Sequence, residues 1–163
     1  MNLTWPNSSL RSLSILIWSV AIGLQVGCSN QSTSREGHVL ELRGGAIEEI
    51  DGWKRTDLVI GGSRGWMAPE VGVDDEMIES AEKTLDYAGR PQLLIRLDAT
   101  GTAKLERLSV EQLSRPIVVL VDGRPVAAPM VMSPLGSLFL ITSENLTDEE
   151  LDDLARRLTH ENE

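Results

Sequence analysis

The sequence predicts an α+β fold in which a mostly antiparallel sheet carries helices packed on one face. Three features support this prediction: an apolar run at residues 117–121, a turn signal directly after it at Asp122 and Gly123, and a capped amphipathic helix near the carboxyl end. Short strands joined by tight turns and accompanied by helices are typical of this fold class. Aromatic residues make up only 4% of the chain, so we expect an aliphatic core.

The first part of the chain, residues 1–27, has the features of a signal peptide. Arg11 supplies the positive charge, and residues 13–24 form an apolar run that is too short for a comfortable membrane span. The segment before Cys28 resembles a bacterial lipoprotein cleavage site, with Gln25 in place of the usual Leu. This resemblance implies lipidation of Cys28 and a lipid-anchored position in the cell envelope, on the periplasmic side. The alternative is a plain thiol next to an uncleaved anchor.

The charge of the chain limits its partners. Its formal net charge is −10, the sign opposite to the one that phosphate backbones attract, so we predict no nucleic-acid binding. An anionic membrane surface would repel the same charge, so contact with the membrane is expected through the lipid anchor alone. The chain has one cysteine, which excludes an internal disulfide.

The segment after the signal peptide divides into two parts. Residues 28–37 are polar and serine-rich, which is typical of a flexible linker. Residues 38–72 are interpreted as a poorly defined N-terminal part. It begins with alternating apolar and polar residues at 38–43, which predict a strand, and Gly44 and Gly45 are expected to end that strand. The rest of this part is expected to hold a short strand and a glycine-rich loop, at residues 58–60 and 61–72.

Residues 73–163 are predicted to form a single α+β domain. A short helix is expected at residues 74–81, because Asp74 or Asp75 can accept hydrogen bonds from its first turn. A hairpin, a helix, a second hairpin, a strand and a last helix should follow in this order. The expected segments are residues 83–87 with 92–97, residues 100–113, residues 117–121 with the strand that returns after the turn, residues 137–142, and a helix opening at Thr147.

The second hairpin and the last helix carry the clearest local signals. Asp122 and Gly123 suit a two-residue turn, in which both positions need positive φ. Pro125 and Pro129 cannot donate to a ladder, so the returning strand is expected at a sheet edge or with a bulge. In the last helix, Thr147 and Glu150 have the spacing of a capping box.

No set of residues predicts catalysis. Ser63 lies in a literal G-x-S-x-G motif, but the glycines after it disfavour the helix that a nucleophile elbow requires. His38 and His160 lie far apart and lack the ligand spacing of a zinc site. Residues 74–76 are acidic and could attract calcium, but without the spacing of a calcium loop a solvated helix start is the preferred interpretation. We therefore predict no enzymatic activity, no cofactor and no metal site.

Several motifs follow one another in residues 93–158. They are a glycine at a helix start, an apolar strand that ends in Asp-Gly, an Ala-Pro strand and a Thr-x-x-Glu helix opening, at Gly101, residues 117–123, residues 127–129 and residues 146–151. In this order the segment resembles the head subdomain of the first periplasmic domain of SecD and SecDF, the membrane accessory of bacterial preprotein translocation. Ser114 departs from the family, which has Gly there. We expect no transport activity, because the proton-coupling transmembrane helices of the family do not follow.

The resemblance implies a function as well as a fold. It implies contact with extended or unfolded polypeptide outside the membrane, with exported chains or Sec translocase components as partners. The candidate binding residues are Ala127, Ala128 and Pro129, which stand in the place of the family's Ser-Ala-Pro. Two other hypotheses stay open: a standalone structural or interaction lipoprotein with an unrelated partner, and, least favoured, a small hydrolase that uses Ser63.

Overall fold

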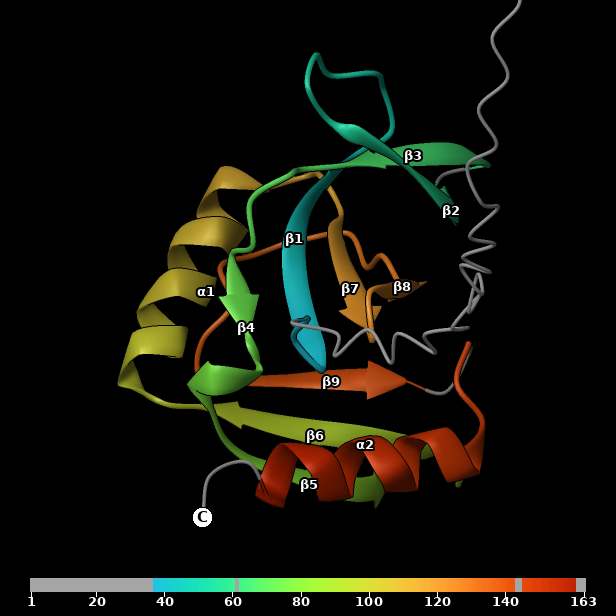
Figure 1. Ribbon diagram of the computed structural model, residues 1–163, viewed down its shortest axis with the longest axis vertical. Helices are drawn as coiled ribbons and strands as arrows, with labels where there is room; N and C mark the ends of the chain where they lie inside the picture. Colours follow the sequence, from blue (N-terminus) through green and yellow to red (C-terminus); the bar gives the residue numbers. More distant parts are fainter. Residues whose placement is uncertain (1–36, 61, 143–144, 161–163) are drawn as a thin grey trace, which may run out of the picture. The chain divides into compact units, whose positions relative to one another are not determined.

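The computed structural model describes residues 37–60, 62–142 and 145–160, and Cys28 with its neighbours lies outside them. Figure 1 shows this part of the chain as two β-sheets accompanied by two α-helices, so the predicted α+β class is confirmed. The strands are mostly antiparallel, as expected. The presence of two sheets was not predicted.

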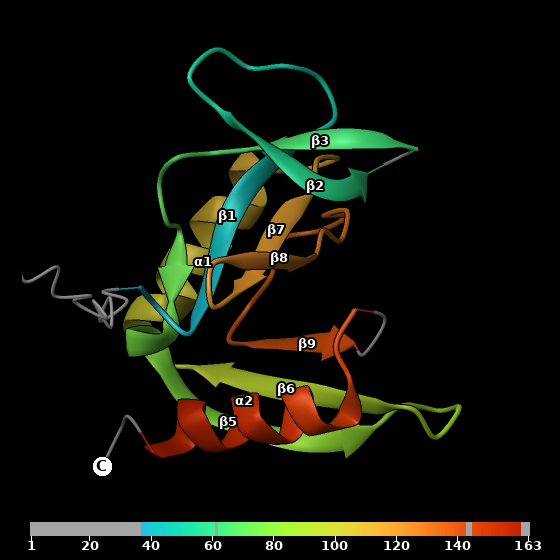
Figure 2. The same ribbon diagram turned by 45° about the vertical axis from the view of Figure 1, so that its right-hand side comes forward.

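The larger sheet has the strand order β2-β3-β1-β7-β8, and the short β4 pairs with β1 outside this path. Its strands are β1 (Leu40–Ala46), β2 (Lys54–Ile60), β3 (Ser63–Met67), β4 (Val73–Asp74), β7 (Ile117–Val121) and β8 (Arg124–Ala127). The smaller sheet has the order β5-β6-β9, with β5 (Ile78–Leu85), β6 (Pro91–Leu97) and β9 (Leu138–Thr142). The helices are α1 (Ala99–Glu111) and α2 (Asp148–His160). As a result β8 and β9 are edge strands of different sheets, and they lie near one another in both views (Figures 1 and 2).

Strand β1 does not end at Gly44 and Gly45, so that prediction is wrong. The strand continues to Ala46 and changes partner on the way, from β7 up to Gly44 to β3 at Gly45. A Cβ atom on Gly45 would lie 3.0 Å from the carbonyl oxygen of Pro116 and 3.0 Å from Cγ2 of Val118. The missing side chain therefore permits a close crossing of two strands, where a strand break was expected.

Two further local predictions are wrong for a related reason. Residues 61–72 are not a continuous loop, because β3 pairs with β2 inside them. Residues 74–81 form no α-helix: a short 3₁₀ turn, Asp75–Met77, leads directly into β5. The side chain of Asp74 makes no capping hydrogen bond, and the segment from Ile78 onward forms strand β5, which pairs with β6 in a hairpin. In both places pairing with the adjacent strand of a hairpin overrode local propensity.

The second hairpin agrees with its prediction. Asp122 and Gly123 have φ values of 50° and 71°, as the two-residue turn requires. Strand β8 lies at the edge of its sheet and its register with β7 shifts between Val119 and Leu120. All residues of β7 are buried, as expected for a central strand covered on both faces.

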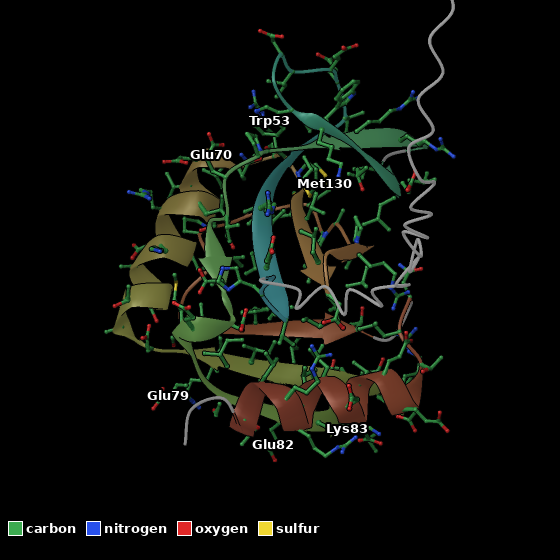
Figure 3. The ribbon with its side chains drawn as sticks, viewed as in Figure 1. Trp53, Glu70, Glu79, Glu82, Lys83 and Met130 are labelled. Atoms are coloured by element: carbon green, nitrogen blue, oxygen red, sulfur yellow. The ribbon has the colours of Figure 1, made fainter. Side chains whose placement is uncertain are left out.

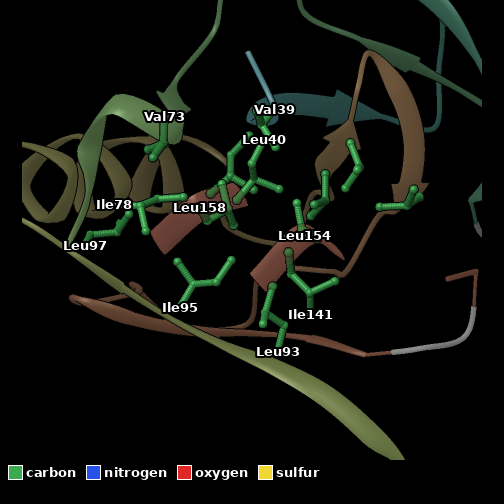
Figure 4. Packing of buried hydrophobic residues seen from close by; sticks show 14 of the residues in the cluster. Val39, Leu40, Val73, Ile78, Leu93, Ile95, Leu97, Ile141, Leu154 and Leu158 are labelled. Carbon is green, nitrogen blue, oxygen red and sulfur yellow. The ribbon is translucent and has the colours of Figure 1, made fainter. Parts of the chain in front are cut away.

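The main core lies among both sheets and both helices. Figure 4 shows Leu93, Ile95 and Ile141 of the smaller sheet pointing toward Leu154 and Leu158 of α2. The capping box holds the start of α2 as predicted. The backbone N–H of Thr147 donates to Oε2 of Glu150 at 2.7 Å, and the backbone N–H of Glu150 donates to Oγ1 of Thr147 at 3.2 Å. Helix α2 thus packs its apolar face over β5 and β6.

Candidate functional site

A groove of about 350 Å³ lies between the two edge strands β8 and β9. Its walls come from the end of β2, from β8 with the residues after it, and from β9 with the loop after it. We call it the β8–β9 groove, and it is lined by Leu58, Val59, Val119, Val126, Ala127, Ala128, Pro129, Leu140, Ile141, Thr142 and Asn145. The three candidate binding residues, Ala127, Ala128 and Pro129, are all among them.

The lining of the β8–β9 groove carries no charged side chain, although charged residues make up 25% of the chain. Two of its apolar side chains face solvent to an unusual degree: Val59 is 70% exposed and Leu140 is 51% exposed. Exposed apolar residues that gather in one hollow indicate an interaction site more strongly than scattered ones do. The groove is therefore suited to an uncharged, apolar ligand.

One hydrogen bond joins the two sides of the β8–β9 groove. The side-chain Nδ2 of Asn145, in the loop after β9, donates to the carbonyl oxygen of Val126 on β8 at 2.7 Å. A second tie comes from α2, which follows this loop. The carboxylate of Glu150 accepts a hydrogen bond from Nη2 of Arg124 at 2.7 Å. These bonds fix the β8 wall relative to the segment that carries the β9 wall.

A second cavity, of about 510 Å³, lies between the β7–β8 turn and α2, and it is polar. The carboxylate of Asp122 accepts two hydrogen bonds from the guanidinium of Arg157, at 2.9 and 2.6 Å, and this pairing raises the pKa of Arg157. The backbone N–H of Thr147 and the charge of Arg124 lower the pKa of Glu150. Because these charges already have partners within the chain, we interpret the cavity as a structural junction that holds the hairpin on α2.

His38 has neighbours that the sequence did not reveal. Its Nδ1 lies 3.1 Å from Oδ1 of Asp75, and its Nε2 lies 4.0 Å from Oδ2 of Asp74. The side chains of Asp74 and Asp75 are only 14% and 10% exposed, so the prediction of a solvated helix start is wrong. Across the described ranges of the chain, no group of three or more His, Cys, Asp or Glu residues is arranged to hold a metal ion.

The structure gives no support to a nucleophile at Ser63. Ser63 is the first residue of β3, and a strand follows it where a nucleophile elbow needs a helix. His160 is the last residue of α2, at the far end of the chain from β3. The side chains of both residues lie outside the part that the structure describes.

Comparison with known families decides the relationship. A family model described as the SecDF P1 head subdomain matches residues 59–160, which include β8, β9 and most of the groove lining. The chain belongs to the SecDF P1 head family. The resemblance that the sequence motifs indicated is thereby confirmed.

The curated relative that matches this chain is much longer than the chain itself. The protein translocase subunit SecD of Magnetococcus marinus is 26% identical over 78 residues, which are 48% of this chain. The matched part is 15% of that relative's length. Among the described residues, no helix is long and apolar enough to cross a membrane.

Two solved structures share the fold of the SecDF head. One is a SecDF described as a membrane component that enhances protein export, with a TM-score of 0.58, 19% identity, and coverage of 75% of this chain and 62% of that chain. The other is SecDF in a super-membrane-facing form, with a TM-score of 0.59, 20% identity, and coverage of 75% and 18%. At this level of identity the agreement concerns the fold alone.

Sequence reasoning missed part of the groove. Val59 was assigned to a short strand, but nothing in the sequence indicated that this strand would end opposite β8. Asn145 also gave no signal beyond its position before the capping box. Both residues reach the groove through contacts between segments that are far apart along the chain.

Proposed function

We propose that this protein is a non-enzymatic, lipid-anchored head domain on the periplasmic side of the cell envelope. In this role it contacts exported polypeptides, or a translocase complex that carries them. The observation that carries the proposal is the β8–β9 groove, which is uncharged, partly apolar and bordered by two sheet edges. Family membership supports the connection to protein export.

The chemistry of the groove agrees with an unfolded client. A polypeptide that has not yet folded exposes runs of apolar side chains and unpaired backbone groups, whereas a folded protein pairs its buried backbone groups and rarely exposes a large apolar patch. The groove lining offers Val59 and Leu140 for apolar contact. The net charge of −10 keeps the domain itself soluble while it exposes these residues.

The anchor is the second part of the proposal. Lipidation of Cys28 would hold the domain at the membrane, and residues 28–37 would act as a flexible tether with a root-mean-square length of about 17 Å. Mass spectrometry of the mature protein tests this directly. A diacylated N-terminal cysteine is the expected result, and an unmodified thiol or an intact signal segment would exclude this anchor.

Site-specific crosslinking in membranes tests the function of the groove. A photoreactive amino acid at Ala128 should capture polypeptides in transit or translocase components. The matched control is Glu79 of β5, an exposed residue that lies toward the lower left of Figure 3, away from β8. Equal capture from both positions would favour the standalone structural lipoprotein. So would a failure of the Ala128 probe to capture either a polypeptide in transit or a translocase component. In that case Ala127→Arg should leave protein export unchanged.

A further inference from the structure

We infer that the free edge of β9 receives an extended, uncharged segment of another polypeptide as an additional β-strand, while the edge of β8 is interrupted for such pairing at Pro125 and Val126. The inference rests on the proposed function and specifies how binding occurs. Strand addition is an established way for proteins to bind extended peptides, with main-chain hydrogen bonds giving affinity and side-chain pockets giving selectivity.

The register of β9 shows which of its backbone groups are free. In an antiparallel pair, opposite residues alternate between hydrogen-bonded and non-hydrogen-bonded pairs. The backbone N–H of Leu97 donates to the carbonyl of Ser137 at 2.8 Å, so this pair is of the hydrogen-bonded type. The same register continues as Leu93 opposite Ile141 and Leu94 opposite Leu140. By alternation, Ile141 is bonded to β6, and Leu140 directs its N–H and C=O away from it.

The residues of β9 whose backbone N–H and C=O groups point away from β6 are therefore Leu138, Leu140 and Thr142. Within the described part of the chain, β9 pairs with β6 alone, and no backbone partner is found on its other side. Leu138 and Leu140 are also 43% and 51% exposed. An unpaired strand edge with exposed apolar side chains is a template for another strand.

The edge of β8 differs from that of β9. Val121 and Arg124 flank the two-residue turn and form a hydrogen-bonded pair, so Pro125, opposite Leu120, faces the free edge and has no N–H to offer. The carbonyl of Val126 is already occupied by Asn145. The edge of β8 is thus interrupted at two consecutive residues, whereas the edge of β9 has no such interruption in the described part of the chain.

The lining of the groove indicates the kind of segment that binds. Because no charged side chain lines it, a charged segment would lose hydration without gaining a partner. A second copy of this chain is disfavoured as occupant, because each copy brings a net charge of −10 to the encounter. The favoured ligand is a short uncharged stretch with alternating apolar side chains, as in an unfolded strand segment.

Peptide binding to the full-length protein in detergent, measured by fluorescence anisotropy, tests the inference. The probe is a labelled ten-residue peptide of alternating Val and Thr, together with two analogues methylated at alternate backbone nitrogens, one on each edge of the strand. Strand addition predicts that one analogue binds about tenfold or more weakly than the parent and the other nearly as well, because only one edge bonds to β9. Equal affinities of the two analogues would overturn the inference. Failure of the parent peptide to bind would overturn it together with the proposed function.

Two variants at one position give an independent measurement. Leu140→Pro removes the outward N–H and leaves the ladder to β6 complete, whereas Leu140→Ala shortens the side chain and keeps the N–H. We expect peptide affinity to fall about tenfold in the first variant and less than about threefold in the second. Equal affinities of the two folded variants would contradict strand addition but leave groove binding intact. Concentration-dependent dimers of the wild type that Leu140→Pro abolishes would show that the edge serves self-association, which overturns the choice of ligand.

Discussion

Truncation of Leu154 tests the central packing interface of the domain. This side chain is 1% exposed and lies in the core between α2 and the smaller sheet (Figure 4). Leu154→Ala removes three buried carbon atoms, which corresponds to about 2.4 kcal/mol of lost transfer free energy at about 0.8 kcal/mol each. Incomplete collapse of the cavity adds to this loss, so we expect the free energy of unfolding to fall by about 3 kcal/mol.

Chemical denaturation followed by circular dichroism measures this change, and thermal unfolding should show a midpoint lower by about 12 °C. The matched control is Arg156→Ala on the opposite face of α2, where the side chain is 69% exposed. That variant should change the free energy of unfolding by less than about 0.5 kcal/mol. If Leu154→Ala cost less than about 1 kcal/mol, α2 would not be packed on the sheet, and the reasoning about the fold would be refuted.

Three further outcomes follow from local contacts. Thr147→Ala should lower the free energy of unfolding by about 1 kcal/mol, because it removes the capping hydroxyl of α2; an unchanged denaturation midpoint would contradict the capping role. Gly123→Ala should destabilise the domain by about 1 kcal/mol, since φ is 71° there, and the matched control is Gly136→Ala, where φ lies outside the left-handed region and an added Cβ would meet no atom within 4 Å. Hydrogen bonds lower the pKa of Glu150 below its ordinary value of 4.5, so its contribution to stability is present above pH 4.5 and is lost as the pH falls through the lower, folded-state pKa. The free energies of unfolding of the wild type and of Glu150→Gln, measured by urea denaturation at a series of pH values, should therefore converge in acid. A stability difference that does not depend on pH would exclude this linkage.

Signals that lie within a few residues of each other allowed the sequence to predict much of the fold. The turn at Asp122 and Gly123 depends only on the φ values that these residues tolerate. The capping box depends on Thr147 and Glu150, which are neighbours on one helical turn. Such features form whatever the rest of the chain does, so a sequence pattern is sufficient to place them.

Other parts of the fold depend on partners that are distant in sequence. Gly45 suggests a strand break until Pro116 and Val118 are known to lie so near that a Cβ atom on Gly45 would be 3.0 Å from each of them. Ile78 belongs to a helix by local propensity and to a strand once Leu97 lies opposite. The lining of the groove also combines residues of both kinds. Residues 127–129 were indicated by the family resemblance, whereas Val59 and Asn145 were found only from the tertiary structure.

An exposed strand edge is a liability unless something limits its pairing, and this domain limits it in three ways. Strand β9 is short, with five residues, so few hydrogen bonds can form along it. The neighbouring edge of β8 is interrupted by Pro125 and by the side chain of Asn145, which occupies the carbonyl of Val126. The net charge of −10 opposes the approach of a second copy. Together these features oppose stable aggregation, and under the proposed function they would still allow brief pairing with an uncharged segment of an unfolded chain.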